Sequence, residues 1–208
     1  MKSRNNIFRV SPSVIICLPF FFMIDIRAAF ICGIISFTIH EIGHLIVAKA
    51  TAHKLKKATL MPFGALFIFE KIKSTSKTAD IFLYSAGILI NFIAGIAFYF
   101  LSRVFSSNVY FTYLIYYNML IAMLNLIPIC SLDGNKILKC ILDIILKEDS
   151  KSVMCDISMV ISIILIIFNT ACIAAGIMII TPFALGLFGI ANTILERKKI
   201  KSDIKVLK

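Results

Sequence analysis

Long apolar runs separated by short polar segments make up most of this chain of 208 residues. A window of about 20 residues, the length that crosses a bilayer core as a helix, separates the runs. They fall at 12–25, 28–50, 79–102, 108–127, 153–168 and 171–194. The last two are nearly continuous, and we expect a break near Asn169-Thr170, with Pro182 as the rival position. The pattern predicts an all-α polytopic membrane protein with about six transmembrane helices.

Composition agrees with a location in the membrane. Hydrophobic residues are 60% of the chain and charged residues 16%, with a mean hydropathy of +0.95, which excludes an ordinary water-soluble domain. A chain of this length holds one helical bundle and leaves no room for a second sizeable domain. We expect residues 1–196 to form a single transmembrane domain and residues 197–208 to form a basic cytoplasmic tail.

Positive charges are distributed unevenly between the expected loops. If the N-terminus lies inside, only Arg27 and Arg103 of the 22 Lys and Arg residues fall in outer loops. This asymmetry follows the positive-inside rule, so we expect an integral membrane protein with both termini in the cytoplasm. The net charge of +11 is then explained by topology and by attraction to anionic lipids of the bilayer. Nucleic acid is not an expected partner, because no basic face carries interleaved stacking aromatics.

The segment His40-Glu41-Ile42-Gly43-His44 lies near the inner end of the run 28–50. Histidines four positions apart on a helix share one face and lie about 6 Å apart along the axis. Both imidazoles can therefore bind one zinc ion, and the adjacent glutamate can act on a water at the metal. The alternative is a pair of hydrogen-bonded core histidines. Because ionisable side chains are costly in an apolar span, we favour a functional site that opens toward the cytoplasm.

A catalytic zinc usually has three protein ligands, so a third is needed. We expect His53 to be a solvated loop histidine, because lysines surround it in the sequence. Glu70 and Asp133 are the two acidic residues at comparable depth. Asp133 follows Pro128, which breaks the helix, and precedes Gly134, which permits a tight turn beside a metal. Asp133 could also be the N-cap of a helix at 135–147, a role that does not exclude metal binding.

Two motifs stand together in this chain: His40-Glu41-x-x-His44 and Asn125-x-x-Pro128-x-x-x-x-Asp133-Gly134. Together they resemble the site-2 protease family of intramembrane zinc metalloproteases. The resemblance implies that His40, His44 and Asp133 bind one Zn²⁺ per chain. It also implies that Glu41 is the general base in peptide-bond hydrolysis.

Two further segments resemble the same family. Pro62-Phe63-Gly64 is similar to part of a small membrane-embedded β segment between spans two and three. Ala86-Gly87-Ile88-Leu89-Ile90-Asn91-Phe92 is similar to an Ala-Gly-Pro-x-x-Asn-Phe stretch. The chain departs from the family pattern at Ile88 and Ser131, where the family has proline, and at Asn135, where it has glycine. These departures affect the rigidity of the loop and leave every implied ligand in place.

A peptide bond inside a helix is shielded, so a protease of this kind must hold its substrate extended. The segment 58–70, with Phe63 and Gly64, has β-forming residues that could pair with an extended peptide; an ordinary re-entrant packing element is the alternative. The amides of Asn91 and Asn125 could support the substrate or the loop that carries Asp133. They could equally form hydrogen bonds between helices.

Within the family, the chain is most similar to the sporulation branch. The short turn at 102–108 has no PDZ insertion, and no CBS domain is expected after the last span. This branch implies a membrane-associated protein substrate, the pro-segment of a sporulation sigma factor, and membrane scaffold or inhibitor proteins as partners. An anti-sigma factor or another single-span protein is the alternative substrate. A different class of protein, an ion- or proton-coupled transporter, would use the buried charges as an ion path.

Overall fold

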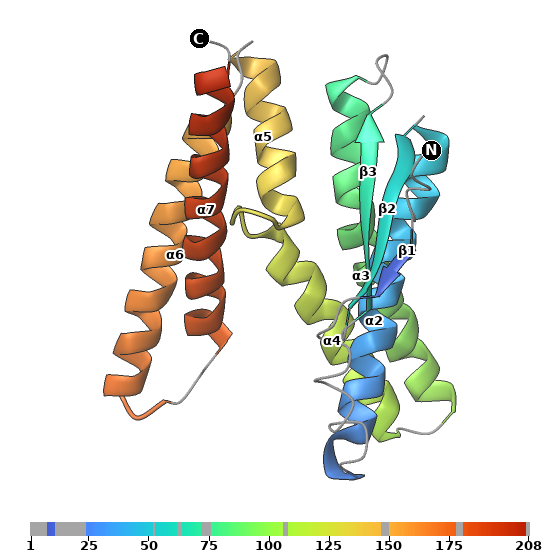
Figure 1. Cartoon of the computed structure of the whole chain (residues 1–208). Coiled ribbons are helices and arrows are strands. Elements are labelled where there is room, and N and C mark those ends of the chain that lie inside the picture. The colour runs from blue at the N-terminus through green and yellow to red at the C-terminus, as the bar shows by residue number, and fades with distance from the viewer. Residues whose placement is uncertain are drawn as a thin grey trace. The chain divides into compact units, whose positions relative to one another are not determined.

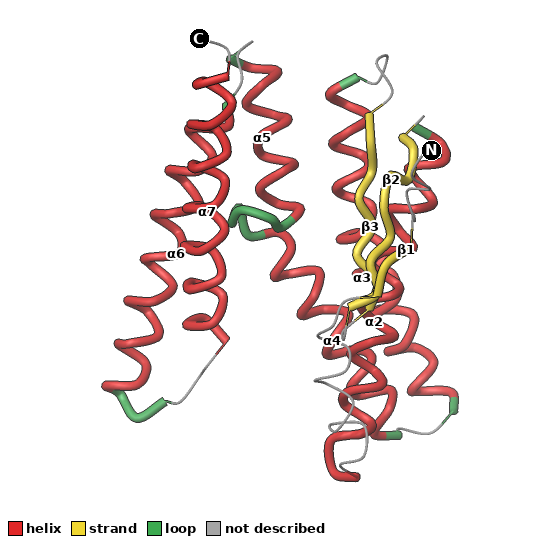
Figure 2. Tube along the Cα trace, viewed as in Figure 1, coloured by secondary structure: helices red, strands yellow, loops and turns green. Residues whose placement is uncertain are grey.

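The computed structural model of the chain describes residues 8–10, 24–51, 53–61, 64–71, 76–105, 108–146, 150–177 and 181–206. Most of these residues are helical, and one small sheet accompanies the helices (Figure 2). The chain divides into two compact units, Met1–Leu124 and Asn125–Lys208. The expected helical architecture with a β segment is therefore present.

In the first unit, helices α2 (Ile24–Ala50) and α3 (Lys77–Val104) pack against each other. Their backbones approach closely at Gly43, where an added methyl group would lie 2.7 Å from the carbonyl oxygen of Ala86. Small residues at such contacts let apolar helices pack tightly. Helix α4 (Val109–Leu126) begins in the first unit, and its last two residues belong to the second. The close contact places the face of α2 that carries the two histidines against α3.

The sheet of the first unit has strands β1 (Phe8–Val10), β2 (His53–Met61) and β3 (Gly64–Lys71) in the order β1-β2-β3. Strand β1 is parallel to β2, and β2 is antiparallel to β3 with Met61 paired to Gly64. The β2–β3 hairpin lies against α2 (Figure 1). The β segment expected at 58–70 is therefore a hairpin that begins earlier, at His53. Pro62 and Phe63, between the two strands, lie outside the described residues.

The second unit holds α5 (Asp133–Ile145), α6 (Lys151–Ala174) and α7 (Thr181–Val206), and α6 packs against both of the others. The break expected near Asn169-Thr170 is wrong, because α6 continues through both residues. Thr170 Oγ1 donates to the carbonyl oxygen of Ile166, so this polar pair is accommodated within the helix. The chain turns instead at Gly176, whose φ of +81° suits glycine. Residues 197–206, expected as a tail, continue α7.

Four helices in the described part of the chain are long and apolar enough to cross a membrane: α2 over Arg27–Ala50, α3, α4 and α6. They correspond to the expected runs 28–50, 79–102, 108–127 and 153–168. The run 12–25 lies almost entirely outside the described residues. The run 171–194 is divided by the turn at Gly176 between α6 and α7. The run-length argument thus identified these four helices correctly.

Candidate metal centre

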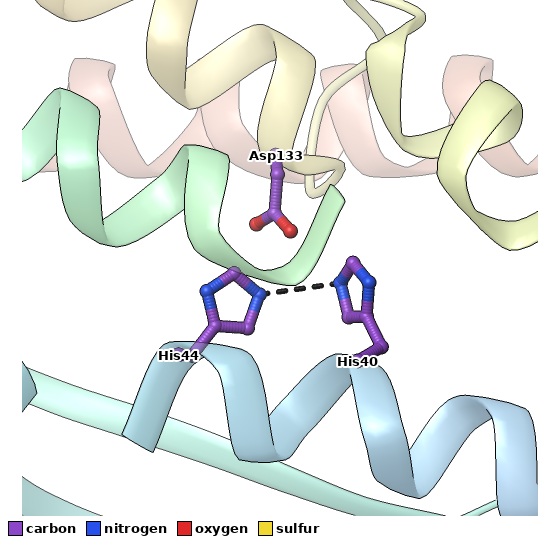
Figure 3. A group of neighbouring side chains, drawn as sticks. All are labelled: His40, His44 and Asp133. Atoms are coloured by element: carbon purple, nitrogen blue, oxygen red, sulfur yellow. Dashed lines mark hydrogen bonds between the residues drawn. The ribbon is translucent and has the colours of Figure 1, made fainter. Parts of the chain in front are cut away.

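His40 and His44 project from one face of α2, as the four-residue spacing predicts (Figure 3). Both side chains are buried, with exposed fractions of 3% and 6%. Their Nε2 atoms lie 3.2 Å apart, and the two rings are nearly perpendicular, at 82°. Two imidazole nitrogens that converge in this way can share one metal ion.

Helix α3 fixes the orientation of the His44 ring. Its Nδ1 atom lies 2.8 Å from the carbonyl oxygen of Leu83. A carbonyl oxygen only accepts, so Nδ1 carries the proton and Nε2 keeps its lone pair. Nε2 is the atom that faces His40. A backbone carbonyl that orients the ring through its other nitrogen is the usual arrangement for a metal-binding histidine.

Gly87 of α3 lies directly opposite both imidazoles. A methyl group added there would lie 2.5 Å from His44 Nε2 and 2.7 Å from His40 Nε2. No side chain other than hydrogen fits at this position without displacing the two rings. In the sequence, Gly87 lies in a stretch that resembles the family, but the sequence gave no physical reason for a glycine at this position. The structure supplies one: the glycine leaves room for the histidine nitrogens.

Asp133 is the first residue of α5 and is 4% exposed. His40, His44 and Asp133 each offer one ligand atom, and these atoms all lie within 4.8 Å of one another (Figure 3). Two imidazole nitrogens and one carboxylate oxygen form a donor set that suits zinc and leaves one coordination position open. Lys136 Nζ also donates to Asp133 Oδ1, at 2.8 Å. The donor set therefore fits a catalytic zinc ion.

Glu41 neighbours the first histidine on α2 and is 6% exposed. Glu41 is thus a buried carboxylate adjacent in the chain to His40, a member of the candidate metal group. Its burial agrees with the expectation that all three ionisable residues of the motif lie inside the protein. Glu70, the rival third ligand, lies in β3, and its side chain is not among those described.

The loop before Asp133 differs in detail from the expectation. Leu132 is the N-cap of α5 and makes no side-chain cap bond, so the N-cap interpretation of Asp133 is wrong. The helix expected at 135–147 begins two residues earlier and ends at Ile145. Asn135 Nδ2 donates to the carbonyl oxygen of Pro128 at 3.3 Å. At Gly134 an added methyl group would lie 2.8 Å from the carbonyl oxygen of Asn125, so glycine is required there.

His53 is not the solvated loop histidine that its neighbours suggested. It begins β2, and 9% of it is exposed. Its Nε2 atom lies 3.0 Å from Asp80 Oδ1, and its Nδ1 atom lies 2.9 Å from Thr51 Oγ1. The expectation failed because α2 leads directly into β2, which brings His53 against the start of α3. The surrounding lysines gave no sign of a partner 27 positions away.

Asn91 is fully buried and donates from Nδ2 to the carbonyl oxygen of Ser36, at 3.2 Å. Asn118 of α4, which the sequence did not single out, donates to Ser36 Oγ at 2.8 Å. Both amides therefore reach α2 one turn before His40. For Asn91 this is the helix-to-helix bond that was left open as an alternative. Asn125 lies at the end of α4 and is half-buried.

The family model described as Peptidase family M50 matches residues 28–109 and 103–169. These ranges extend over more than half of the chain and include His40, Glu41, His44 and Asp133. The match confirms the family to which the two motifs pointed.

Two curated relatives match about half of the chain. A zinc metalloprotease of Methanocaldococcus jannaschii is 35% identical over 117 residues, which are 54% of this chain and 34% of that protein. Stage IV sporulation protein FB of Bacillus subtilis is 30% identical over 111 residues, 53% of this chain and 38% of that protein. The matched region is thus little more than a third of either relative.

The fold is similar to a solved structure, the Site-2 Protease from Methanocaldococcus jannaschii. The TM-score is 0.68 at 25% sequence identity, and the match covers 91% of this chain and 89% of that chain. Together with the four apolar helices, this likeness indicates an integral membrane protein.

Proposed function

The chain belongs to peptidase family M50, and from this membership we propose that it is a zinc metalloprotease that cleaves its substrate within the membrane. The observation that carries the proposal is the buried group of His40, His44 and Asp133, whose ligand atoms lie within 4.8 Å of one another. Two ionisable side chains on the apolar helix α2 and a buried carboxylate at the start of α5 are costly unless they bind something. The transporter alternative is not favoured, because the family match is to peptidases.

His40 and His44 would both bind the same zinc ion through Nε2, and Asp133 would bind it through a carboxylate oxygen. A zinc ion held there supplies Lewis-acid chemistry, which polarises a scissile carbonyl and lowers the pKa of a water toward about 7. The carbonyl of Leu83 keeps the proton of His44 on Nδ1 and so preserves the lone pair that the metal needs. Gly87 keeps the space opposite the rings free for the metal and the substrate.

Glu41 acts as the general base. Its carboxylate accepts a proton from the attacking water and returns that proton to the leaving amine. The support is its position in the motif and its burial, which keeps competing solvent away from the carboxylate.

The β2–β3 hairpin holds the substrate in an extended form. The support comes from the sheet order, because β3 is the outer strand of the sheet β1-β2-β3 in the described part of the chain. An outer strand has unpaired backbone groups that can pair with an extended peptide. Gly64 begins this strand, and we propose that it and Phe63 help to admit the peptide. Asn125 is proposed as a support for the substrate or the loop before Asp133.

The chain crosses the membrane about six times, with both termini in the cytoplasm and the metal site near the cytoplasmic side. The support is the concentration of Lys and Arg in the expected inner loops. The β2–β3 hairpin is embedded in the membrane between spans two and three. Residues 1–196 then form one catalytic domain and residues 197–208 a basic tail.

The substrate is the pro-segment of a membrane-associated sporulation sigma factor, with membrane scaffold or inhibitor proteins as further partners. The support is the likeness to stage IV sporulation protein FB. The test is co-expression with such a pro-sigma factor or with a single-span anti-sigma factor, using Glu41→Gln as the inactive control. Glu41-dependent shortening of the pro-sigma factor alone supports the proposal. Shortening of only the anti-sigma factor would overturn the sporulation substrate and leave the protease activity standing.

A further inference from the structure

The loop between α4 and α5, residues 127–132, is called here the ligand loop because Asp133 follows it directly. Two of its backbone N–H groups bond within the loop: Ile129 to the carbonyl of Ile127 at 2.8 Å, and Leu132 to that of Ile129 at 3.0 Å. The N–H of Cys130 instead donates to Ser158 Oγ of α6, at 2.8 Å. The ligand loop is therefore bonded to α6 at Cys130, three positions before Asp133, through the side-chain hydroxyl of Ser158.

The hydroxyl of Ser158 is itself hydrogen-bonded to a second buried hydroxyl. Ser158 Oγ lies 2.9 Å from Thr193 Oγ1 of α7. Ser158 and Thr193 are both fully buried, with 0% exposed. Because Ser158 Oγ already accepts from Cys130, the hydroxyl pair continues a chain of hydrogen bonds from the ligand loop through α6 to α7. Both helices thus contribute to the position of the loop.

Packing at the same place is close. Gly189 lies one turn before Thr193 on α7, and a methyl group added there would lie 2.8 Å from Ile129 Cγ2 and would overlap Ser162 Oγ. Ile129 is itself fully buried. The ligand loop is therefore seated on α6 and α7 by both an apolar side chain and a hydrogen bond.

The conformation of the ligand loop needs such support. Ser131 has a φ of +83°, a left-handed conformation that is unfavourable for a residue other than glycine. Strained backbone persists only where the surroundings fix it. Irregular backbone between apolar helices also needs a partner for each polar group. The bond from the N–H of Cys130 to Ser158 Oγ fixes the backbone immediately before Ser131 and gives that N–H a hydrogen-bond partner.

We propose that Ser158 and Thr193 are positioning residues for the metal site, and that they hold the ligand loop in the conformation that presents Asp133 to the metal. The inference rests on the proposed function, because it takes Asp133 as a zinc ligand. The α6–α7 pair then supports the third ligand, Asp133, in addition to anchoring the chain in the membrane. We expect loss of this support to weaken metal binding at least about tenfold, the lower end of the range for groups that bond a metal ligand directly.

The test compares variants of the full chain, purified in detergent, by competition of a chelator for zinc. Thr193→Val keeps the shape and removes the hydroxyl, whereas Thr193→Ser keeps the hydroxyl. Ser162→Ala is the matched control, because its buried hydroxyl on α6 bonds the carbonyl of Ser158 in its own helix. We expect Ser158→Ala and Thr193→Val to weaken zinc binding at least about tenfold. Thr193→Ser and Ser162→Ala should stay close to the unaltered chain.

Cobalt substitution gives a second measurement that a loss of general stability would not change. The d–d absorption bands of bound Co²⁺ report the ligand geometry, so they should shift in Thr193→Val and return in Thr193→Ser. Unchanged zinc affinity and unchanged bands in both Ser158→Ala and Thr193→Val would overturn the inference. Asp133→Ala is measured alongside to separate the two proposals. If Asp133→Ala keeps its zinc, the proposed metal site is wrong. If Asp133→Ala loses zinc while Ser158→Ala and Thr193→Val keep it, only the positioning role is wrong.

Discussion

The imidazole of His53 and the carboxylate of Asp80 form a buried pair, with Nε2 of the histidine 3.0 Å from Oδ1 of the aspartate. The pair joins the first residue of β2 to the first turn of α3. On the same helix, one turn further on, the carbonyl oxygen of Leu83 accepts from His44. The start of α3 thus holds both the β hairpin and a proposed metal ligand.

Breaking this pair should destabilise the protein. Asp80→Ala removes the hydrogen-bond partner of the buried His53 ring, and a buried polar group that loses its partner costs about 1 to 3 kcal/mol. The free energy of unfolding in detergent measures the effect. The matched control is Asp156→Ala, which breaks the exposed pair with Arg197 and should cost less than about 1 kcal/mol. An equal decrease in the free energy of unfolding in the two variants would show that the buried His53–Asp80 pair stabilises the fold no more than an exposed pair.

Gly87→Ala should weaken metal binding in a folded protein. The added methyl group would lie 2.5 Å from His44 Nε2, so the rings must move apart. We expect zinc binding to weaken at least about tenfold, measured as zinc per chain after dialysis against a chelator. Gly33→Ala on α2 is the control, because an added methyl group there meets nothing within 4 Å. Full zinc content in Gly87→Ala would contradict the geometry proposed for the two histidines.

Glu41→Gln should separate metal binding from chemistry. The amide keeps the size of the side chain but does not accept a proton, so cleavage should fall at least about 100-fold. The zinc content should stay that of the unaltered chain, because Glu41 is not a ligand. Both quantities are measured on the same preparation, with a membrane-tethered pro-protein as substrate. Cleavage near the unaltered rate would remove Glu41 as the base.

Reporter fusions test the topology. Fusions after Lys54 and Lys208 should read cytoplasmic, and fusions near Arg103 and Gly176 should read exterior, because positive charge collects on the inner side. The fusion is placed at Gly176 and not at the expected break near Asn169, because the chain turns at Gly176. An exterior signal at Lys208 would mean that the number of spans is odd.

The local features of the site could be predicted from the sequence because they depend on spacing along one helix. His40 and His44 share a face of α2 by helical geometry alone, and their burial follows from the apolar run around them. Asp133 needed more than the geometry of one helix, because Glu70 was a rival at comparable depth. Pro128 and Gly134 beside Asp133 favoured it, and the family resemblance then implied its role. The four apolar helices followed from run length, which is the strongest signal in a membrane protein.

The features that could not be predicted join residues far apart in the chain. Ser36 and Asn118 are 82 positions apart, and Ser158 and Thr193 are 35 apart. Each of these residues is unremarkable in its own segment, so no local pattern marks the pair. The error at Asn169-Thr170 had another cause. Single polar residues fit inside a helix when their side chains bond its own carbonyls, so polarity alone did not end α6.

The most direct test of the central claim is the zinc content of the purified chain and of three variants, His40→Ala, His44→Ala and Asp133→Ala. The measurement is metal per chain by mass spectrometry after removal of loosely bound ions. The proposal predicts about one zinc per unaltered chain and loss of most of it in each variant, because three ligands define the site. Full retention of zinc in Asp133→Ala, with loss in the two histidine variants, would contradict the proposal and remove Asp133 from the metal.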